Sequence, residues 1–365
     1  MAAESFSRRR RHRPRRRLLY PLLALATAAL TLALLTLATA GPGTEEESRG
    51  DVSLRVEPRP ADGKVSQAAP SLPTTAPFEP NRAEVYPSAK RLAGRALQRL
   101  VTYGPGTRPA EAASAAGGDA VFRDAARTLV RPSVRSTGEV LYAQFGGLTA
   151  TQASVMVLLR QRTASARGRS AVTRTVDVRL RLRAGKWRLD RIASLGGSPV
   201  RKPSKLSPAA RRVLANPRIK LPDSARWDIY RGGIDPALLA SLDGAARLGS
   251  LAVAVLRSGH PVEVFGTDRR SAHTDGYAAD IWAVNGLSVI RQRAMGSPAH
   301  RLARQLYDAG SAQLGSPWVF AGLGTSFTDA VHQDHLHVQR RPVPGGRAGP
   351  GEAAPDVRTG AEVST

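Results

Sequence analysis

The chain has 365 residues, no cysteine and a formal net charge of +25. Without cysteine it has neither a disulfide framework nor a thiolate metal site, so any metal ion must be held by histidines and carboxylates. A surface this basic favours anionic partners. The length suffices for two modest domains with additional segments around them.

The first 40 residues predict a membrane anchor. Residues 1–17 hold eight arginines and one glutamate, and residues 18–40 carry no charge and consist mainly of Leu, Ala and Thr. At about 1.5 Å per residue the second stretch is long enough for a hydrocarbon core of about 30 Å, so we expect a transmembrane signal anchor behind a basic cytoplasmic tail. The expected placement is single-pass, type II, in the cell membrane, with most of the chain outside. A cleaved signal peptide is the alternative, because Ala38-Thr39-Ala40 resembles a small-residue cleavage site.

Three further stretches have the composition of connecting segments. Residues 41–87 are rich in proline and predict a disordered stalk, and the Gly/Pro-rich residues 342–365 predict a disordered tail. Residues 198–231 are rich in proline and basic residues, which predicts a linker with one short helix around residues 208–214.

Residues 88–197 have the pattern of a separate α+β module. Apolar residues recur at helical spacing over residues 89–103 and 119–130. The period then changes to two, and Val176, Val178 and Leu180 alternate with charged residues, as in antiparallel strands. Helices followed by long antiparallel strands resemble the small cone folds related to nuclear transport factor. No catalytic motif accompanies the pattern, so we expect a spacer or docking module.

Residues 232–341 predict a second α+β domain. Asp235-Pro236 is typical of a helix start, with an acidic N-cap and proline at the first helical position. Residues 251–256 form a short apolar run that predicts a buried strand, and a helix is expected from Ser297-Pro298 to Gly310. Residues 318–320 and 335–339 are further strand candidates.

The polar residues of this domain suggest a metal site. If residues 278–283 form a strand, His273 precedes a turn at Gly276 and can fold back to meet Asp280, while His335 and His337 share one face of a later strand. Three of these four groups would supply two imidazoles and one carboxylate and leave one coordination position open, the pattern expected of catalytic zinc. Zinc lowers the pKa of a bound water toward neutrality, and the remaining histidine could act as a base or stabilise the intermediate.

The spacing of these residues carries a specific resemblance. The pattern is Ser271-x-His273-x-x-Gly276-x-Ala278-x-Asp280 followed by His335-x-His337. It resembles the signature of the zinc D-Ala-D-Ala carboxypeptidase and endopeptidase family, in the metallopeptidase group that also contains lysostaphin-type and hedgehog domains. The resemblance covers residues 235–340.

The resemblance implies a role for each matching residue. It implies that His273, Asp280 and His337 bind Zn²⁺ and that His335 is the catalytic histidine beside it. It also implies an α+β fold with a small antiparallel sheet flanked by helices, and substrates that are peptidoglycan stem peptides or cross-links. Arg257 matches the place where such enzymes keep an arginine for the substrate carboxylate, which a planar guanidinium suits.

Two features of this motif bear on the choice between an enzyme and a binding scaffold. Ser271 has no histidine partner suggestive of a triad, so we expect a turn hydroxyl beside the site and group it with Arg257 as substrate-binding rather than nucleophilic. The Glu-x-x-His ending of some members of the group is missing, since residues 332–337 read His-Gln-Asp-His-Leu-His, with Asp334 expected on the opposite strand face.

The predicted function is therefore a membrane-anchored zinc metallopeptidase that hydrolyses peptide bonds in peptidoglycan. The alternative is a catalytically weak or inactive wall-associated scaffold that binds peptidoglycan or a partner protein. The expected partner is peptidoglycan or another anionic cell-wall polymer. Nucleic acid is not an expected partner, because the predicted topology places the basic surface outside the cell and no aromatic residues are interleaved with the charges.

Overall fold

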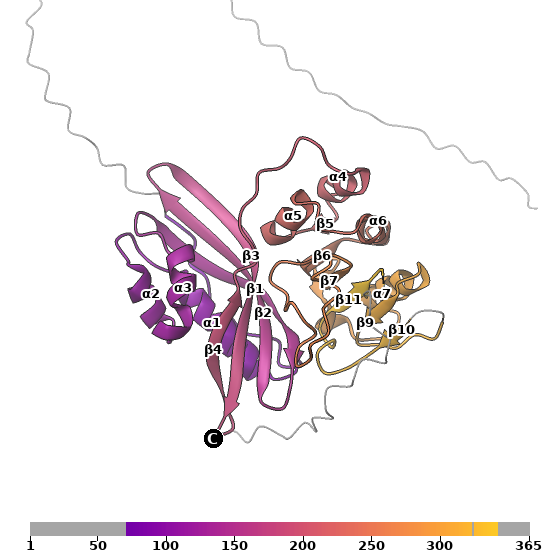
Figure 1. Ribbon diagram of the computed structural model, residues 1–365, viewed down its shortest axis with the longest axis horizontal. Helices are drawn as coiled ribbons and strands as arrows, with labels where there is room; N and C mark the ends of the chain where they lie inside the picture. The colour runs from indigo at the N-terminus through magenta and orange to yellow at the C-terminus, as the bar shows by residue number, and fades with distance from the viewer. Residues whose placement is uncertain (1–70, 323–324, 342–365) are drawn as a thin grey trace, which may run out of the picture. The chain divides into compact units, whose positions relative to one another are not determined.

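The structure is a computed structural model that describes residues 71–322 and 325–341, all within one compact unit of residues 64–365. The described residues form two α+β modules, each with its own sheet (Figure 1). We call residues 71–195 the first module and residues 207–341 the second module. The mixed α+β composition agrees with the sequence pattern.

The first module packs three helices against one face of a four-stranded antiparallel sheet with strand order β1-β2-β3-β4 (Figure 1). Its elements are α1 (Pro87–Leu100), α2 (Pro109–Ala115), α3 (Asp119–Leu129), β1 (Arg135–Leu148), β2 (Gln152–Ser165), β3 (Gly168–Arg183) and β4 (Lys186–Ser194).

The period-two pattern of β3 explains the core of the first module. Val176, Val178 and Leu180 lie in one apolar cluster with residues of α1 and α3, and all three are fully buried. Asp177 points to the opposite face and is buried as well, where its carboxylate pairs with Arg179 at 2.7 Å. The middle of β3 therefore has buried side chains on both faces of the sheet.

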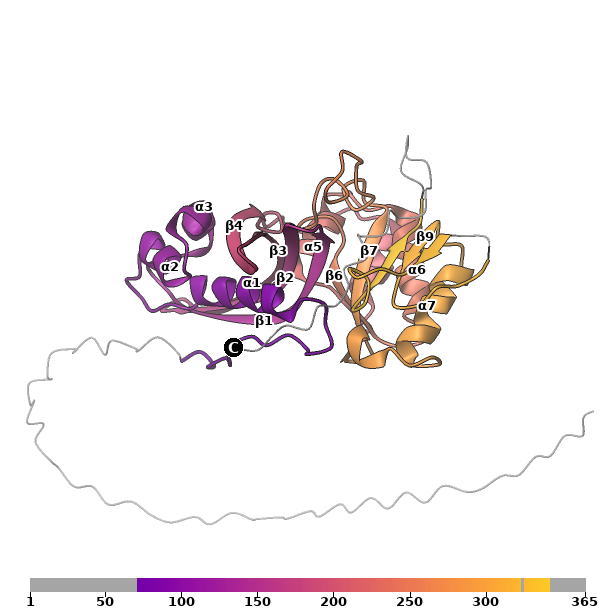
Figure 2. The same ribbon diagram turned by 90° about the horizontal axis from the view of Figure 1, so that it is seen from below.

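The second module is built on a seven-stranded sheet of order β10-β9-β11-β7-β6-β5, with β8 paired to β7. Its elements are α4 (Pro208–Ala215), β5 (Ile219–Lys220), α5 (Asp223–Tyr230), α6 (Pro236–Ala245), β6 (Leu251–Val255), β7 (Ala278–Val284), β8 (Leu287–Ser288), the 3-10 helix η1 (Val289–Gln292), α7 (Pro298–Asp308), β9 (Gln313–Gly315), β10 (Thr325–Phe327) and β11 (Leu336–Gln339). Figure 2 shows α7 lying against this sheet beside β7 and β9.

The sheet of the second module is mixed rather than purely antiparallel as predicted. β5 pairs in parallel with β6, and β10 pairs in parallel with β9, while the strands between them are antiparallel. Residues 318–320, predicted as a strand, form a loop in which the Ser316 hydroxyl accepts a hydrogen bond from the Trp318 amide at 3.1 Å. This local side-chain contact competes with strand pairing.

The predicted helix starts of the second module are confirmed. Asp235 Oδ1 accepts hydrogen bonds from the amides of Ala237 and Leu238, and the Ser297 hydroxyl accepts one from the amide of His300. The stretch 198–231, predicted as a linker, contains α4, β5 and α5, whose apolar residues join the core of the second module.

The predicted transmembrane helix requires a correction. Among residues 71–322 and 325–341, no helix is long and apolar enough to cross a membrane. The predicted anchor, residues 18–40, lies outside the described residues, as do the predicted cytoplasmic tail, most of the stalk and the C-terminal tail. The described residues thus give no support to a membrane helix in the fold class or to the single-pass, type II placement in the cell membrane.

Candidate metal centre

A tight turn brings His273 back over the sheet of the second module. The amide of Gly276 donates to the carbonyl of His273 at 3.0 Å, and Gly276 has a positive φ of 73°. A side chain at residue 276 would collide with the backbone carbonyl of Gly233, so glycine is required here for two reasons. The turn directs the His273 imidazole toward β7, as the sequence predicts.

Strand pairing brings His337 next to Asp280. β11 and β7 are antiparallel neighbours, and their register places His337 directly opposite Asp280. Side chains that face each other in this way share one surface of the sheet. Residues separated by 57 positions in the chain therefore meet because the two strands are adjacent.

The three predicted ligands converge on one point. His273 Nε2 lies 3.2 Å from Asp280 Oδ1 and 3.1 Å from His337 Nδ1, and His337 Nδ1 lies 3.0 Å from Asp280 Oδ1. Tetrahedral zinc with bonds of about 2.0–2.2 Å separates its ligand atoms by about 3.3–3.6 Å. The observed triangle is within a few tenths of an ångström of that spacing.

The hydrogen bond on the far side of His273 sets its tautomer. His273 Nδ1 lies 2.7 Å from the backbone carbonyl of Leu256, at the end of β6. A carbonyl only accepts, so Nδ1 donates to it and Nε2 is the ring nitrogen that faces Asp280 Oδ1. In this buried place Nε2 and Oδ1 lie 3.2 Å apart, close to the spacing of two ligand atoms on one metal ion.

His260 is a fourth group at this centre. Its ring stacks on that of His273 with centroids 3.9 Å apart, and its Nδ1 lies 2.8 Å from the carbonyl of Pro261. The ligand atoms of His260, His273 and Asp280 all lie within 4.8 Å of one another, and these three residues could hold a metal ion. The sequence analysis did not single out His260, because it lies outside the motif and no spacing connects it to Asp280.

Burial and the neighbouring charges set the protonation states of the centre. Burial opposes ionisation of Asp280, but His273 and His337 outweigh it and hold the pKa of that carboxyl well below its ordinary value. Burial lowers the pKa of His337 to about 4 and moves the pKa of His260 well below its ordinary value. At neutral pH the centre thus holds the Asp280 carboxylate with neutral His260 and His337 imidazoles, which are forms that bind metals.

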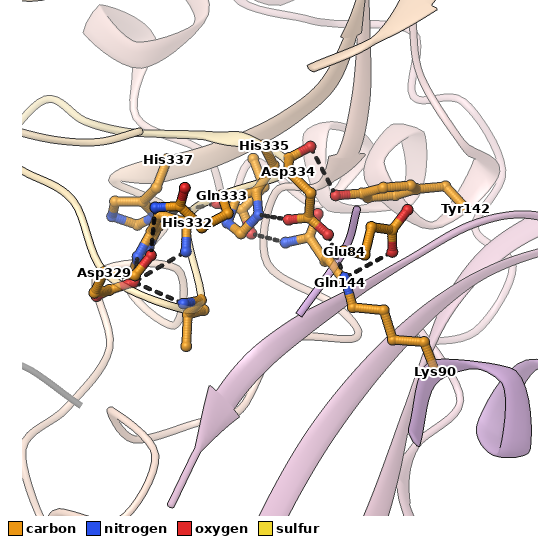
Figure 3. A network of polar contacts seen from close by, with 12 residues as sticks. Glu84, Lys90, Tyr142, Gln144, Asp329, His332, Gln333, Asp334, His335 and His337 are labelled. Atoms are coloured by element: carbon orange, nitrogen blue, oxygen red, sulfur yellow. Dashed lines mark hydrogen bonds and ion pairs between the residues drawn. The ribbon is translucent and has the colours of Figure 1, made fainter. Parts of the chain in front are cut away.

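His335 stands beside the centre in a separate chain of contacts. Its Nδ1 lies 2.8 Å from Asp334 Oδ1, and Asp334 pairs with the ammonium group of Lys90 on α1 (Figure 3). Burial opposes the charge of Asp334, but Lys90 and His335 overcome it and lower the pKa of Asp334 to about 2. Asp334, which the sequence placed on the far strand face, is the residue that orients His335.

The two predicted substrate-binding residues have different surroundings. Arg257 is exposed and lines a cavity of about 770 Å³ that His260 also borders. Ser271 is buried, and its hydroxyl accepts a hydrogen bond from the His273 amide at 3.3 Å. This contact places Ser271 in the turn that carries His273, on the inner side of that turn.

The sequence missed the residues that the first module contributes. Lys90 and Tyr142 contact Asp334 (Figure 3), and Gln144 contacts Asp280. They lie at least 130 positions before the residues they contact, on elements without any motif, so no spacing in the sequence connects them to the centre.

No protein-family model, curated protein or solved structure matches this chain. The assignment of the centre therefore depends on its own geometry and on the motif.

Proposed function

We propose that the chain is a zinc metallopeptidase that hydrolyses peptide bonds in peptidoglycan stem peptides or cross-links. The observation that carries the proposal is the triangle of His273 Nε2, Asp280 Oδ1 and His337 Nδ1, with sides of 3.0–3.2 Å. Two imidazoles and one carboxylate leave one position of a tetrahedral zinc ion open, as in hydrolytic sites.

Each residue would have a definite task. His273, Asp280 and His337 would hold the ion, which in such sites supplies an activated water for attack on a carbonyl. His335, with Nδ1 held by Asp334, would present Nε2 as the group that moves a proton to or from the reacting atoms. Arg257, at the edge of the cavity, would bind a carboxylate of the substrate.

The substrate class is supported by the motif and by the charge. The motif Ser271 to Asp280 with His335-x-His337 resembles peptidases of the cell wall, and a net charge of +25 favours an anionic polymer as partner. A second candidate function is a wall-binding scaffold without turnover. The near-complete burial of His273, Asp280 and His335, each at most 1% exposed, favours a structural ion over a catalytic one.

The test uses the purified full chain and two variants. Wild type should contain about one zinc ion per molecule and release D-alanine or peptides from peptidoglycan. His337→Ala should lose the zinc, whereas His335→Ala should keep the zinc and lose the activity. His300→Ala, which removes a histidine of α7 outside the centre, is the control and should keep both.

The outcomes separate the two functions. Zinc in wild type without product release would favour the scaffold. A zinc content that is zero in wild type, or unchanged in His337→Ala, would contradict the metal centre itself.

A further inference from the structure

The first module reaches directly into the metal centre. The side-chain amide of Gln144, on β1, donates a hydrogen bond from Nε2 to Asp280 Oδ2 at 2.7 Å. Both residues are at most 1% exposed. A buried hydrogen bond to a carboxylate is stronger than one between neutral groups and fixes the orientation of the acceptor.

The two oxygens of Asp280 consequently have different partners. Oδ1 faces His273 Nε2 and His337 Nδ1, while Oδ2 is held by Gln144. The carboxylate cannot rotate to present both oxygens to an ion without breaking the bond to Gln144. The contact therefore favours ligation through Oδ1 alone.

β1 is shaped to bring Gln144 to this position. Its pairing with β2 is shifted at two places, between Val140 and Tyr142 and between Phe145 and Gly147, so Gln144 lies between two irregularities. Irregularities of this kind bend a strand and redirect its side chains. A side chain at Gly146 would also come within 2.9 Å of Pro261, so glycine allows β1 to approach the loop that follows His260.

A second contact from the same strand face supports the arrangement. Tyr142 lies two residues before Gln144, and its hydroxyl donates to the backbone carbonyl of Asp334 at 3.1 Å. Its ring stacks on Trp282 of β7 with centroids 5.0 Å apart and planes inclined by 15°. β1 thus holds β7 and the segment before β11, the two places from which Asp280 and His335 come.

The orientation of the Gln144 amide indicates a role other than folding stability. Nε2 must face the carboxylate, because Oε1 in that place would oppose another acceptor. Oε1 is then buried without a hydrogen-bond partner among the described residues. An unpaired buried carbonyl destabilises the fold, so glutamine is a poor choice here unless its amide serves the centre.

We infer that the first module is a structural part of the metal centre, and that Gln144 is the positioning residue that holds Asp280 for metal binding. The inference rests on the proposed function for the identity of the ion. It replaces the expected role of this module as a spacer or docking unit.

The test is the zinc affinity of the full-length Gln144→Met variant, measured by competition with a chromophoric chelator. Methionine has a similar volume and no donor. Loss of such a supporting hydrogen bond typically weakens metal binding about 10- to 100-fold. The unfolding midpoint of the metal-free protein should also fall, because the buried Oδ2 loses its donor, so the zinc affinity is the measurement that decides.

Gln161→Met is the matched control. Gln161 lies on β2 of the same sheet and donates only within the first module, to Leu129 O and Ser136 Oγ. We expect wild-type zinc affinity for this variant, with a lower unfolding midpoint. A purely structural contribution of Gln144 would produce the same pattern as Gln161.

Failure of this inference is distinguishable from failure of the proposed function. If wild type binds zinc and Gln144→Met binds it with equal affinity, the positioning role is overturned, but the metal site is not. Wild type that binds no zinc would overturn both.

Discussion

Asp280 concentrates the chemistry of the centre in one buried side chain. Its carboxylate is 1% exposed and is surrounded by His273, His337 and the Gln144 amide. A buried charge persists only where partners replace the lost water. The same arrangement that keeps the carboxyl ionised therefore also suits it to bind a metal ion.

Lys90 is a buried cation, and it likewise needs partners that replace the lost water. It is 1% exposed and pairs with Asp334 and, at 2.9 Å, with Glu84. Burial lowers the pKa of its ammonium group, but Asp334 and Glu84 outweigh burial and raise that pKa above its ordinary value. Lys90 is consequently charged at neutral pH and connects α1 to the residue that orients His335.

We expect Lys90→Met to destabilise the protein by about 3–5 kcal/mol, because it leaves two carboxylates in a buried place without their cation. The measurement is the free energy of unfolding in urea. Arg304→Met, which breaks an exposed pair with Asp308, is the control and should change it little. A Lys90→Met effect as small as that of the control would mean that water reaches Asp334 and that His335 is not rigidly held.

At the scale of the element, the turn before β7 determines where His273 lies. Gly276 and Gly286 both have positive φ, at 73° and 79°, at the two ends of the strand. A Cβ at residue 276 would meet the backbone of Gly233, whereas a Cβ at residue 286 would meet nothing within 4 Å. A substitution at residue 286 therefore causes backbone strain alone, whereas one at residue 276 causes backbone strain and a steric clash.

We expect Gly286→Ala to cost about 1–2 kcal/mol of unfolding free energy, the usual cost of a left-handed alanine. Gly276→Ala should cost clearly more and should also lower the zinc affinity, because the turn must move and His273 moves with it. Urea unfolding and chelator competition measure the two effects. Equal costs for the two variants, with unchanged zinc affinity, would show that the turn can shift without disturbing the centre.

The length and pattern of the individual strands explain which parts of the fold and the site the sequence could predict. Once residues 278–283 are taken as a strand, the alternation of side chains puts Asp280 on a defined face, and the motif adds His273 and His337. The short strands β5 and β10 have only two and three residues, too few for a period, and so the parallel edges of the sheet were missed. His260 and Gln144 reach the centre through tertiary packing alone, for which a single sequence contains no signal.

At the scale of the whole described unit, polar contacts join the two modules near the centre. Each module has its own large apolar core, and a small third cluster contains Tyr142, Leu158 and Ala254 with the partly buried Leu141 and Trp282. Beside it, the Thr175 hydroxyl donates to the carbonyl of Ala254 at 2.5 Å. With so few apolar residues in the third cluster, hydrogen bonds such as those of Gln144, Tyr142 and Thr175 contribute to holding the modules together.

This coupling predicts that zinc stabilises both modules. Zinc binding to the native state alone adds about 2.7 kcal/mol when the free ion exceeds its dissociation constant 100-fold. We expect removal of zinc with a chelator to lower the unfolding midpoint and to speed amide hydrogen exchange in β7 and β11, which carry proposed ligands. Exchange should also accelerate in β1 around residues 142–145, which carry no ligand, because Gln144 is bonded to Asp280.

The turn at Ala184 and Gly185 between β3 and β4 is the internal reference for the exchange experiment. Neither residue contacts the centre, so amide exchange in this turn should not depend on zinc. In Gln144→Met, the zinc-dependent protection of residues 142–145 should shrink while that of β7 remains, once zinc is added to saturation. Protection confined to β7 and β11 in wild type would mean that the first module only lies against the centre. Protection that extends through Gln144 into β1 is what a centre shared by two modules requires.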